Sequence, residues 1–290
     1  MVLYPPTIMR IFIPSYNRAE TITTTKIFTN HEVQVVVHNE EQAKPYIENG
    51  IEPLISNTPP GLVNQRQWVL EQAEEGEWVI MLDDNIRKFM CVKEEFYGQD
   101  LLSPEEAKHA HQVVAEEDRV MSIFEEIIEK TDSLNLYLAG IRPFSSPFYG
   151  RKKWKVNGFC RGKCLIIKRD KNMNFGKMKS IEDMEFNCMN MLEKGGMMRM
   201  DYLYPDAPAY GGQKGGLGLL SDREEQLYKE CKELMERYPE LLRYKGWKKS
   251  TKMGTDVQFR LYKAEKINKW RQAMVATGKA NPSLFENYPY

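Results

Sequence analysis

Three consecutive side chains with oxygen atoms, Asp83, Asp84 and Asn85, follow the apolar run of residues 78–82. Carboxylate and amide oxygens are the ligands that Mg²⁺ and Mn²⁺ prefer, and such an ion offsets the charge of a diphosphate while it binds and leaves. Two of these side chains, one residue apart beyond a strand, can reach one ion or its bound waters. The same residue types are common in turns, where they bond to the backbone.

A second acidic pair, Glu182 and Asp183, stands at the predicted start of a helix. Carboxylates are favoured there by capping and by the helix dipole, so a structural role is open. A group-transfer enzyme also needs a carboxylate that takes the proton from an attacking hydroxyl group. The pair therefore fits a general base as well as a helix start.

Two arginines, Arg18 and Arg66, are candidates for binding phosphate oxygens or a nucleotide base. A guanidinium group donates paired hydrogen bonds to such oxygens. Either arginine could instead form an ordinary surface ion pair.

Alternating strands and helices are predicted for the first third of the chain. The strands are expected at residues 10–14, 33–38, 52–56 and 77–82, and the helices at residues 19–28, 40–48 and 62–73. This alternation predicts an α/β fold with a parallel sheet and right-handed crossovers. Ligands of such sheets bind beyond the carboxyl ends of the strands, where residues 15–18 and 83–85 fall.

The rest of the chain is less regular. Helical patterns are expected at residues 103–130, as one helix or two, and at 182–194 and 221–237. Strands are expected at 134–141 and 164–168, and a basic loop at 145–155. The length of 290 residues suits one large domain with a modest appendage. We expect the domain at residues 1–220 and a helical, basic extension packed on it at residues 221–290.

Charge and composition restrict the partners less than the motifs do. The 41 basic and 41 acidic residues balance, but residues 142–179 are strongly basic. This segment could face a polyanion or form solvated helix faces. No stretch approaches the ~20 apolar residues of a membrane span, and no signal peptide is recognisable, so we expect a soluble, cytoplasmic protein. The five cysteines are expected to be buried thiols rather than zinc ligands.

The motifs together resemble those of inverting GT-A glycosyltransferases over about residues 8–200, in the same order along the chain. The matching segments are Ile13-Pro-Ser-Tyr-Asn-Arg18, residues 61–66, Leu82-Asp-Asp-Asn85 and Glu182-Asp183. The resemblance implies that the first strand end holds a nucleotide, the Asp-x-Asp position holds ribose and metal, and the late acidic motif supplies the base.

Carried onto this sequence, the resemblance assigns a role to each motif. The implied donor-binding residues are Pro14, Ser15, Asn17, Arg18, Arg66, Asp83 and Asp84. Asp84 and Asn85 are the implied ligands of Mn²⁺ or Mg²⁺, although Asn85 stands where the family usually has Asp, which weakens metal binding. Asp183 is the implied general base and Glu182 its helper. The family often adds a late histidine ligand, but no histidine follows Asp183 here.

Among GT-A enzymes the chain is most similar to the phage glycosyltransferases associated with TET/JBP oxygenases, which glycosylate 5-hydroxymethylpyrimidines in DNA. This likeness implies transfer from a UDP-sugar to 5-hydroxymethylcytosine in double-stranded DNA, in the cytoplasm of a bacterial host if the protein is phage-encoded. The implied DNA-binding residues are Arg151, Lys152, Lys153, Trp154, Lys155, Lys248 and Lys249. The aromatic residue of this group, Trp154, could equally belong to the core.

Two other functions remain open at this point. The same donor site would serve a GT-A enzyme that acts on a polysaccharide or another glycan, and a noncatalytic DNA-binding module could share the fold. Neither a dinucleotide-binding glycine motif nor a P-loop follows a predicted strand, so a dehydrogenase or a P-loop ATPase is not favoured.

Overall fold

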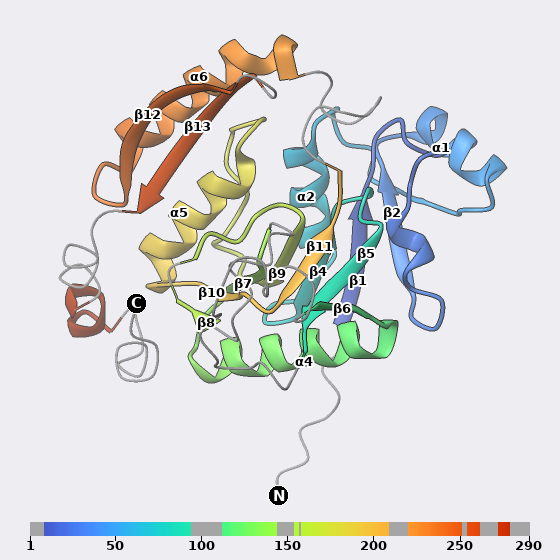
Figure 1. Ribbon diagram of the computed structural model, residues 1–290, viewed down its shortest axis with the longest axis horizontal. Coiled ribbons are helices and arrows are strands. Elements are labelled where there is room, and N and C mark those ends of the chain that lie inside the picture. Colours follow the sequence, from blue (N-terminus) through green and yellow to red (C-terminus); the bar gives the residue numbers. More distant parts are fainter. Residues whose placement is uncertain are drawn as a thin grey trace, which may run out of the picture.

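A computed structural model describes residues 9–93, 112–143, 154–156, 158–208, 220–250, 254–261 and 272–278. Its centre is an eight-stranded sheet with the order β3-β2-β1-β4-β9-β7-β10-β8 (Figure 1). The strands are β1 (Met9–Pro14), β2 (Val33–Val37), β3 (Leu54–Ile55), β4 (Trp78–Leu82), β7 (Leu138–Ile141), β8 (Trp154–Lys155), β9 (Cys164–Lys168) and β10 (Met198–Met200).

The strand directions bring several carboxyl ends to one edge of the sheet. β1, β2, β3 and β4 are parallel, and β9 runs antiparallel between β4 and β7. β7 and β10 are parallel to each other, and β8 is antiparallel at the end of the sheet. The predicted α/β class with a mostly parallel sheet is confirmed. The carboxyl ends of β1, β4, β7 and β10 therefore share an edge.

Helices cover both faces of this sheet because its central strands are apolar on both faces. Along β4, Trp78, Ile80 and Leu82 belong to one buried cluster, whereas Val79 and Met81 belong to the other. The first cluster lies under α4 (Glu117–Ser133) and α1 (Glu40–Glu48). The second lies under α2 (Leu62–Glu71) and α5 (Glu182–Lys194). The helices predicted at residues 40–48, 62–73 and 182–194 are confirmed as α1, α2 and α5.

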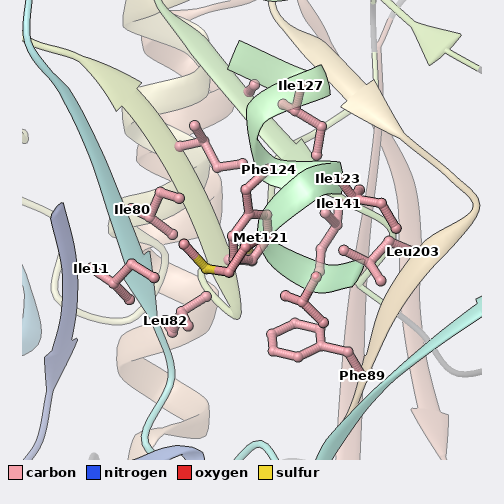
Figure 2. Close-up of a cluster of buried hydrophobic side chains, with 14 of the residues drawn as sticks. Ile11, Ile80, Leu82, Phe89, Met121, Ile123, Phe124, Ile127, Ile141 and Leu203 are labelled. Atoms are coloured by element: carbon pink, nitrogen blue, oxygen red, sulfur yellow. The ribbon is translucent and has the colours of Figure 1, made fainter. Parts of the chain in front are cut away.

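The packing of α4 shows how one face is closed. Phe124 is fully buried, with Ile123 and Ile127 beside it and Ile80 and Leu82 of the sheet nearby (Figure 2). Each such side chain contributes roughly 1.5–3 kcal/mol when it is buried. This cluster anchors the strand that leads into Asp83.

A smaller sheet, with the order β11-β5-β6, lies beside the first. Its strands are β5 (Lys88–Val92), β6 (Gln112–Ala115) and β11 (Leu203–Asp206). The helix expected over residues 103–130 is wrong at residues 112–115, which pair with β5 instead. Their β-branched pair Val113-Val114 suits a strand. Residues 103–111 lie outside the described part.

The helix expected at residues 19–28 is also wrong, since only a 3-10 turn, Thr24–Lys26, forms there. Threonines compete for backbone groups with their own hydroxyls and are poor helix formers. The Thr24 hydroxyl donates to the Asp83 carbonyl at 2.6 Å, and the Thr23 amide donates to the Asp84 carbonyl at 3.0 Å. The segment thus supports the acidic turn after β4.

The extension after residue 220 is only partly helical. It begins with the expected helix, α6 (Leu220–Arg237), but continues as an antiparallel pair, β12 (Leu242–Ser250) and β13 (Gly254–Leu261). The alternation of apolar and polar residues at 257–261 is a strand pattern that the helical expectation overlooked. Within the described residues, no helix is both long and apolar enough to span a bilayer.

Candidate active site

The two acidic motifs meet at the guanidinium group of Arg66. Arg66 lies on α2 and is 2% exposed. Its Nη1 is 2.5 Å from Oε1 of Glu182, and its Nη2 is 3.5 Å from Oδ1 of Asp83. Residues from β4, α2 and α5, far apart in sequence, therefore share one site at the carboxyl edge of the sheet.

Gly162, just before β9, joins Arg66 to Asp183. Its carbonyl oxygen accepts from Arg66 Nη2 at 2.7 Å, and its amide donates to Asp183 Oδ2 at 2.8 Å. A Cβ at this position would lie 2.6 Å from Arg66 Nη2, so a larger residue would force the buried guanidinium group to move. The Met184 amide donates to Oδ1 of Asp183, which fixes that carboxylate from both oxygens.

A second group of side chains locks the turn after β1 to the turn after β4. Ser15 donates to Oδ2 of Asp84 at 2.6 Å, and Arg18 Nη1 lies 2.6 Å from its Oδ1. The Ser15 hydroxyl also lies 2.7 Å from that of Tyr46 on α1. Both oxygens of Asp84 are thus engaged within the protein. Arg18, predicted to contact the donor, pairs with Asp84 in this structure.

Burial and charge shift the titration of the site. Burial raises the pKa of Asp83 to about 6, although the nearby Arg66 guanidinium opposes this shift. Burial likewise raises the pKa of Glu182 to about 7, again opposed by Arg66. Carboxyl groups with raised pKa values that gather in one place are typical of functional sites.

Asn85 is the residue best suited to accept a metal ion. Its Oδ1 is buried and has no hydrogen-bond partner within the described residues. The side chain of Asp83, two residues before Asn85 in the sequence, is 28% exposed. No group of three or more acidic, histidine or cysteine side chains able to hold an ion occurs in the described part. The residues fit an ion held by few protein oxygens: Asp83 and Asn85 could reach one, whereas both oxygens of Asp84, a predicted ligand, already have partners.

The remaining predicted site residues are spread more widely. Pro14 ends β1, and Asn17 in the following turn has a φ of 53°. Trp154 packs edge to face on Tyr202, with ring centroids 6.5 Å apart, as expected for a core residue. Lys155 pairs with Asp201. The backbone of Lys248 and Lys249 belongs to β12, whereas Arg151, Lys152 and Lys153 lie outside the described residues.

A family model described as TET-Associated Glycosyltransferase matches residues 9–216, which is most of the chain. The chain belongs to this family. It is therefore a glycosyltransferase, and the expected resemblance is confirmed at the level of the family. No curated protein matches the chain.

The solved structures to which this glycosyltransferase is similar are distant from it. One is glucosyl-3-phosphoglycerate synthase from Mycobacterium tuberculosis in complex with Mn²⁺, UDP and phosphoglyceric acid, with 8% identity, 88% of this chain and 86% of that chain covered, and a TM-score of 0.48. Another is CMP:2-keto-3-deoxy-manno-octonic acid synthetase complexed with CTP, with 12% identity, 78% and 99% covered, and a TM-score of 0.36.

His38 and the cysteines have structural surroundings in this glycosyltransferase. The Gly61 amide donates to Nε2 of His38 at 3.2 Å, and Nδ1 lies 3.2 Å from the Thr58 hydroxyl. Burial lowers the pKa of His38, so its neutral form is favoured. His38 therefore holds the turn before α2. All five cysteines are buried free thiols.

Sequence reasoning missed two residues that border the site. Lys163 precedes β9, its carbonyl accepts from the Asp83 amide, and Asp83 and Asp206 act on its charge. Burial lowers the pKa of Lys163. Gly162 gave no signal of its own, because a glycine needed for one close contact looks like any other. The basic run at residues 142–179 was the available indication for Lys163.

Helix α6, beyond the matched range, holds the segment that leads into α5. The Glu230 carboxylate accepts from the Lys179 amide at 2.9 Å and from the Ser180 amide at 2.8 Å. Glu185 of α5 accepts from the Met178 amide at 2.9 Å and pairs with Arg237 of α6. The position of Glu182 and Asp183 therefore depends on α6.

Replacing Glu230 with Gln should loosen this segment. The change leaves one backbone amide facing an amide group, so we expect the free energy of unfolding to fall by about 1–3 kcal/mol. Hydrogen exchange at residues 179 and 180 should accelerate, and glycosyl transfer should slow. The matched control is Glu236→Gln on the exposed side of α6. Equal exchange rates at residues 179 and 180 in the two variants would contradict the role of Glu230.

Proposed function

We propose that this glycosyltransferase moves a sugar, with inversion, from a UDP-sugar to 5-hydroxymethylcytosine in double-stranded DNA. The observation that carries the proposal is the meeting of Asp83, Arg66 and the Glu182-Asp183 pair at one sheet edge. A donor-binding acid and a general base must face the same anomeric carbon, and this arrangement allows it.

The donor is proposed to lie across the carboxyl ends of β1 and β4. The nucleotide would contact the turn at residues 14–18, and Asp83 would contact the ribose. A Mn²⁺ or Mg²⁺ ion held by Asp83 and Asn85 would offset the charge of the departing diphosphate. The unpartnered Oδ1 of Asn85 supports this position for the ion.

Asp183 is proposed as the general base. The acceptor hydroxyl gives its proton to Asp183 while its oxygen bonds to the anomeric carbon. The bond between that carbon and the diphosphate oxygen breaks in the same step, and UDP leaves with its electron pair. Hydrogen bonds from Gly162 and Met184 orient the carboxylate for this task. Arg66 keeps Glu182 and Asp83 in place around it.

The DNA acceptor is supported by the family's description and by the distribution of charge. A glycosyltransferase associated with TET enzymes suits a hydroxymethylated base as acceptor. The strongly basic stretch at residues 142–179, with Lys155 at the end of the sheet, suits DNA phosphates. Chemistry on a base usually requires that it leaves the helix stack.

Wild-type protein with Mn²⁺ and a set of UDP-sugars should glycosylate duplex DNA that contains 5-hydroxymethylcytosine, but not the unmodified duplex. Replacing Asp183 with Asn should lower kcat by about 10²–10⁴-fold and keep UDP binding, because only the proton acceptor is lost. Asp170→Asn is the matched control, since Asp170 is equally buried beyond the opposite end of β9. Transfer to a glycan but not to the modified DNA would contradict the proposed acceptor.

The pH dependence of transfer should report the raised carboxyl pKa values. Asp83 and Glu182 are protonated at low pH, and their raised pKa values mean that the ionised forms dominate only above about 6 and about 7. We expect kcat/KM for the donor to decline as pH falls through this range, by at least about tenfold per pH unit at the acid end. A profile that stays flat from about pH 8 to about pH 5 would show that neither carboxylate must be ionised.

A further inference from the structure

Arg142, the residue after β7, carries a buried guanidinium group. It is 3% exposed, and its Nε, Nη1 and Nη2 have no hydrogen bond of good geometry among the residues that the structure describes. The guanidinium carbon lies 4.0 Å from the ring centroid of Tyr204, and the Tyr204 side chain acts on the charge of Arg142. No hydrogen bond of good geometry reaches the buried Tyr204 hydroxyl from the described residues. Proteins rarely bury such a charge without an anion beside it. The pair therefore indicates a site for an anionic ligand.

The carboxylate in this neighbourhood is already engaged by other cations. Asp201 acts electrostatically on Arg142, but its Oδ1 is 2.7 Å from Arg199 Nε and its Oδ2 is 2.7 Å from Lys155 Nζ. Its side chain is 2% exposed. Three cations thus gather around one carboxylate, and the excess charge is positive.

Arg142 lies at the same edge of the sheet as the proposed donor site, but it is not part of that site. β7 and β4 are both antiparallel to β9, which lies between them, so their carboxyl ends share one edge. Neighbouring strands are ~4.8 Å apart, which puts these two ends about 10 Å apart. Asp83 follows β4 and Arg142 follows β7. An anion at Arg142 would therefore lie about two strands from the donor's diphosphate.

The connection from β7 to β8 links this site to the predicted DNA-binding residues. Arg142 stands at its start and Lys155 at its end, and both act on Asp201. Arg151, Lys152 and Lys153 belong to the same connection and lie outside the described residues. In the sequence, the basic run therefore lies between Arg142 and Lys155.

We propose that Arg142, together with the Tyr204 hydroxyl, binds a backbone phosphate of the DNA acceptor. The inference rests on the proposed function, because it assumes a nucleic-acid acceptor. A guanidinium group and a hydroxyl group both donate to phosphate oxygens, and a planar guanidinium can donate to two of them at once. A phosphate bound there would balance the buried charge and fix the DNA next to the anomeric carbon.

The test compares Arg142→Gln with Arg10→Gln, which removes the same charge at the amino end of β1, on the opposite edge of the sheet. The probes are UDP and a duplex oligonucleotide that contains 5-hydroxymethylcytosine. In Arg142→Gln we expect DNA affinity to fall about tenfold and UDP affinity to stay unchanged. The slope of log K for DNA against log salt concentration should become shallower by about one. In Arg10→Gln both affinities should equal those of the wild type.

Several results would overturn the proposal. Equal DNA affinities in the two variants would show that Arg142 does not contact the acceptor, and a loss of UDP affinity in Arg142→Gln would assign the site to the donor diphosphate. If Arg142→Gln lowers Tm, the same binding measurements are made on Arg142→Lys, which keeps the charge but not the paired donors. Severalfold weaker DNA binding with full UDP binding supports the proposal, and unchanged DNA binding overturns it.

Transfer assays on the wild type separate this inference from the proposed function. If the wild type glycosylates the modified duplex while both variants bind it equally, the function stands and the role of Arg142 fails. If the wild type binds DNA without transfer and Arg142→Gln weakens that binding, the role of Arg142 stands and the proposed acceptor base fails. A wild type that does not bind DNA would overturn both.

Discussion

The buried guanidinium of Arg66 is the interaction on which the rest of the site depends. A charge that is 2% exposed must be compensated within the protein, and here three different parts of the chain supply the acceptors. Glu182 comes from α5, the Gly162 carbonyl from the segment before β9, and Asp83 from the turn after β4. Loss of any of them would take an acceptor away from the buried guanidinium group, so this packing fixes their relative positions.

The same constraint ties the site to parts of the molecule far from it. Asp83 is followed by Asp84, which accepts hydrogen bonds from Ser15 and Arg18. The turn after β1 is therefore fixed relative to the turn after β4. The helix that carries Glu182 is held in turn by Glu230 of α6. The family match ends before α6, yet this helix supports the acidic pair within the matched range.

Local patterns in the sequence were enough to predict most elements that carry the site. α1, α5 and β9 occupy the expected residues. Strong stop signals, Asn49-Gly50 and Gly195-Gly196, end the two helices, and β9 is a short run of apolar residues. Residues 19–28 failed because their backbone bonds to a turn about sixty residues away, which a local pattern does not contain. The strand β6 was missed for a similar reason, since only its pairing with β5 defines it.

The site could be predicted as residue types but not as a network. The acidic motifs and the two arginines are visible in the sequence, whereas the pairing of Arg66 with Glu182 and of Arg18 with Asp84 depends on the folded chain. The engagement of Asp84 moves the proposed metal ligands to Asp83 and Asn85. Arg142 could not be singled out from the sequence, because its significance lies in the burial of its guanidinium group, whose nitrogens have no hydrogen bond of good geometry within the described residues.

The most direct measurement is a crystal structure of the protein with UDP and Mn²⁺. The account predicts UDP across the ends of β1 and β4, its ribose at Asp83, the ion at Asp83 and Asn85, and the Arg66–Glu182 pair intact, with Asp183 facing the end of the diphosphate. UDP bound away from this edge, or a rearrangement that separates Asp83 from Asp183, would contradict it.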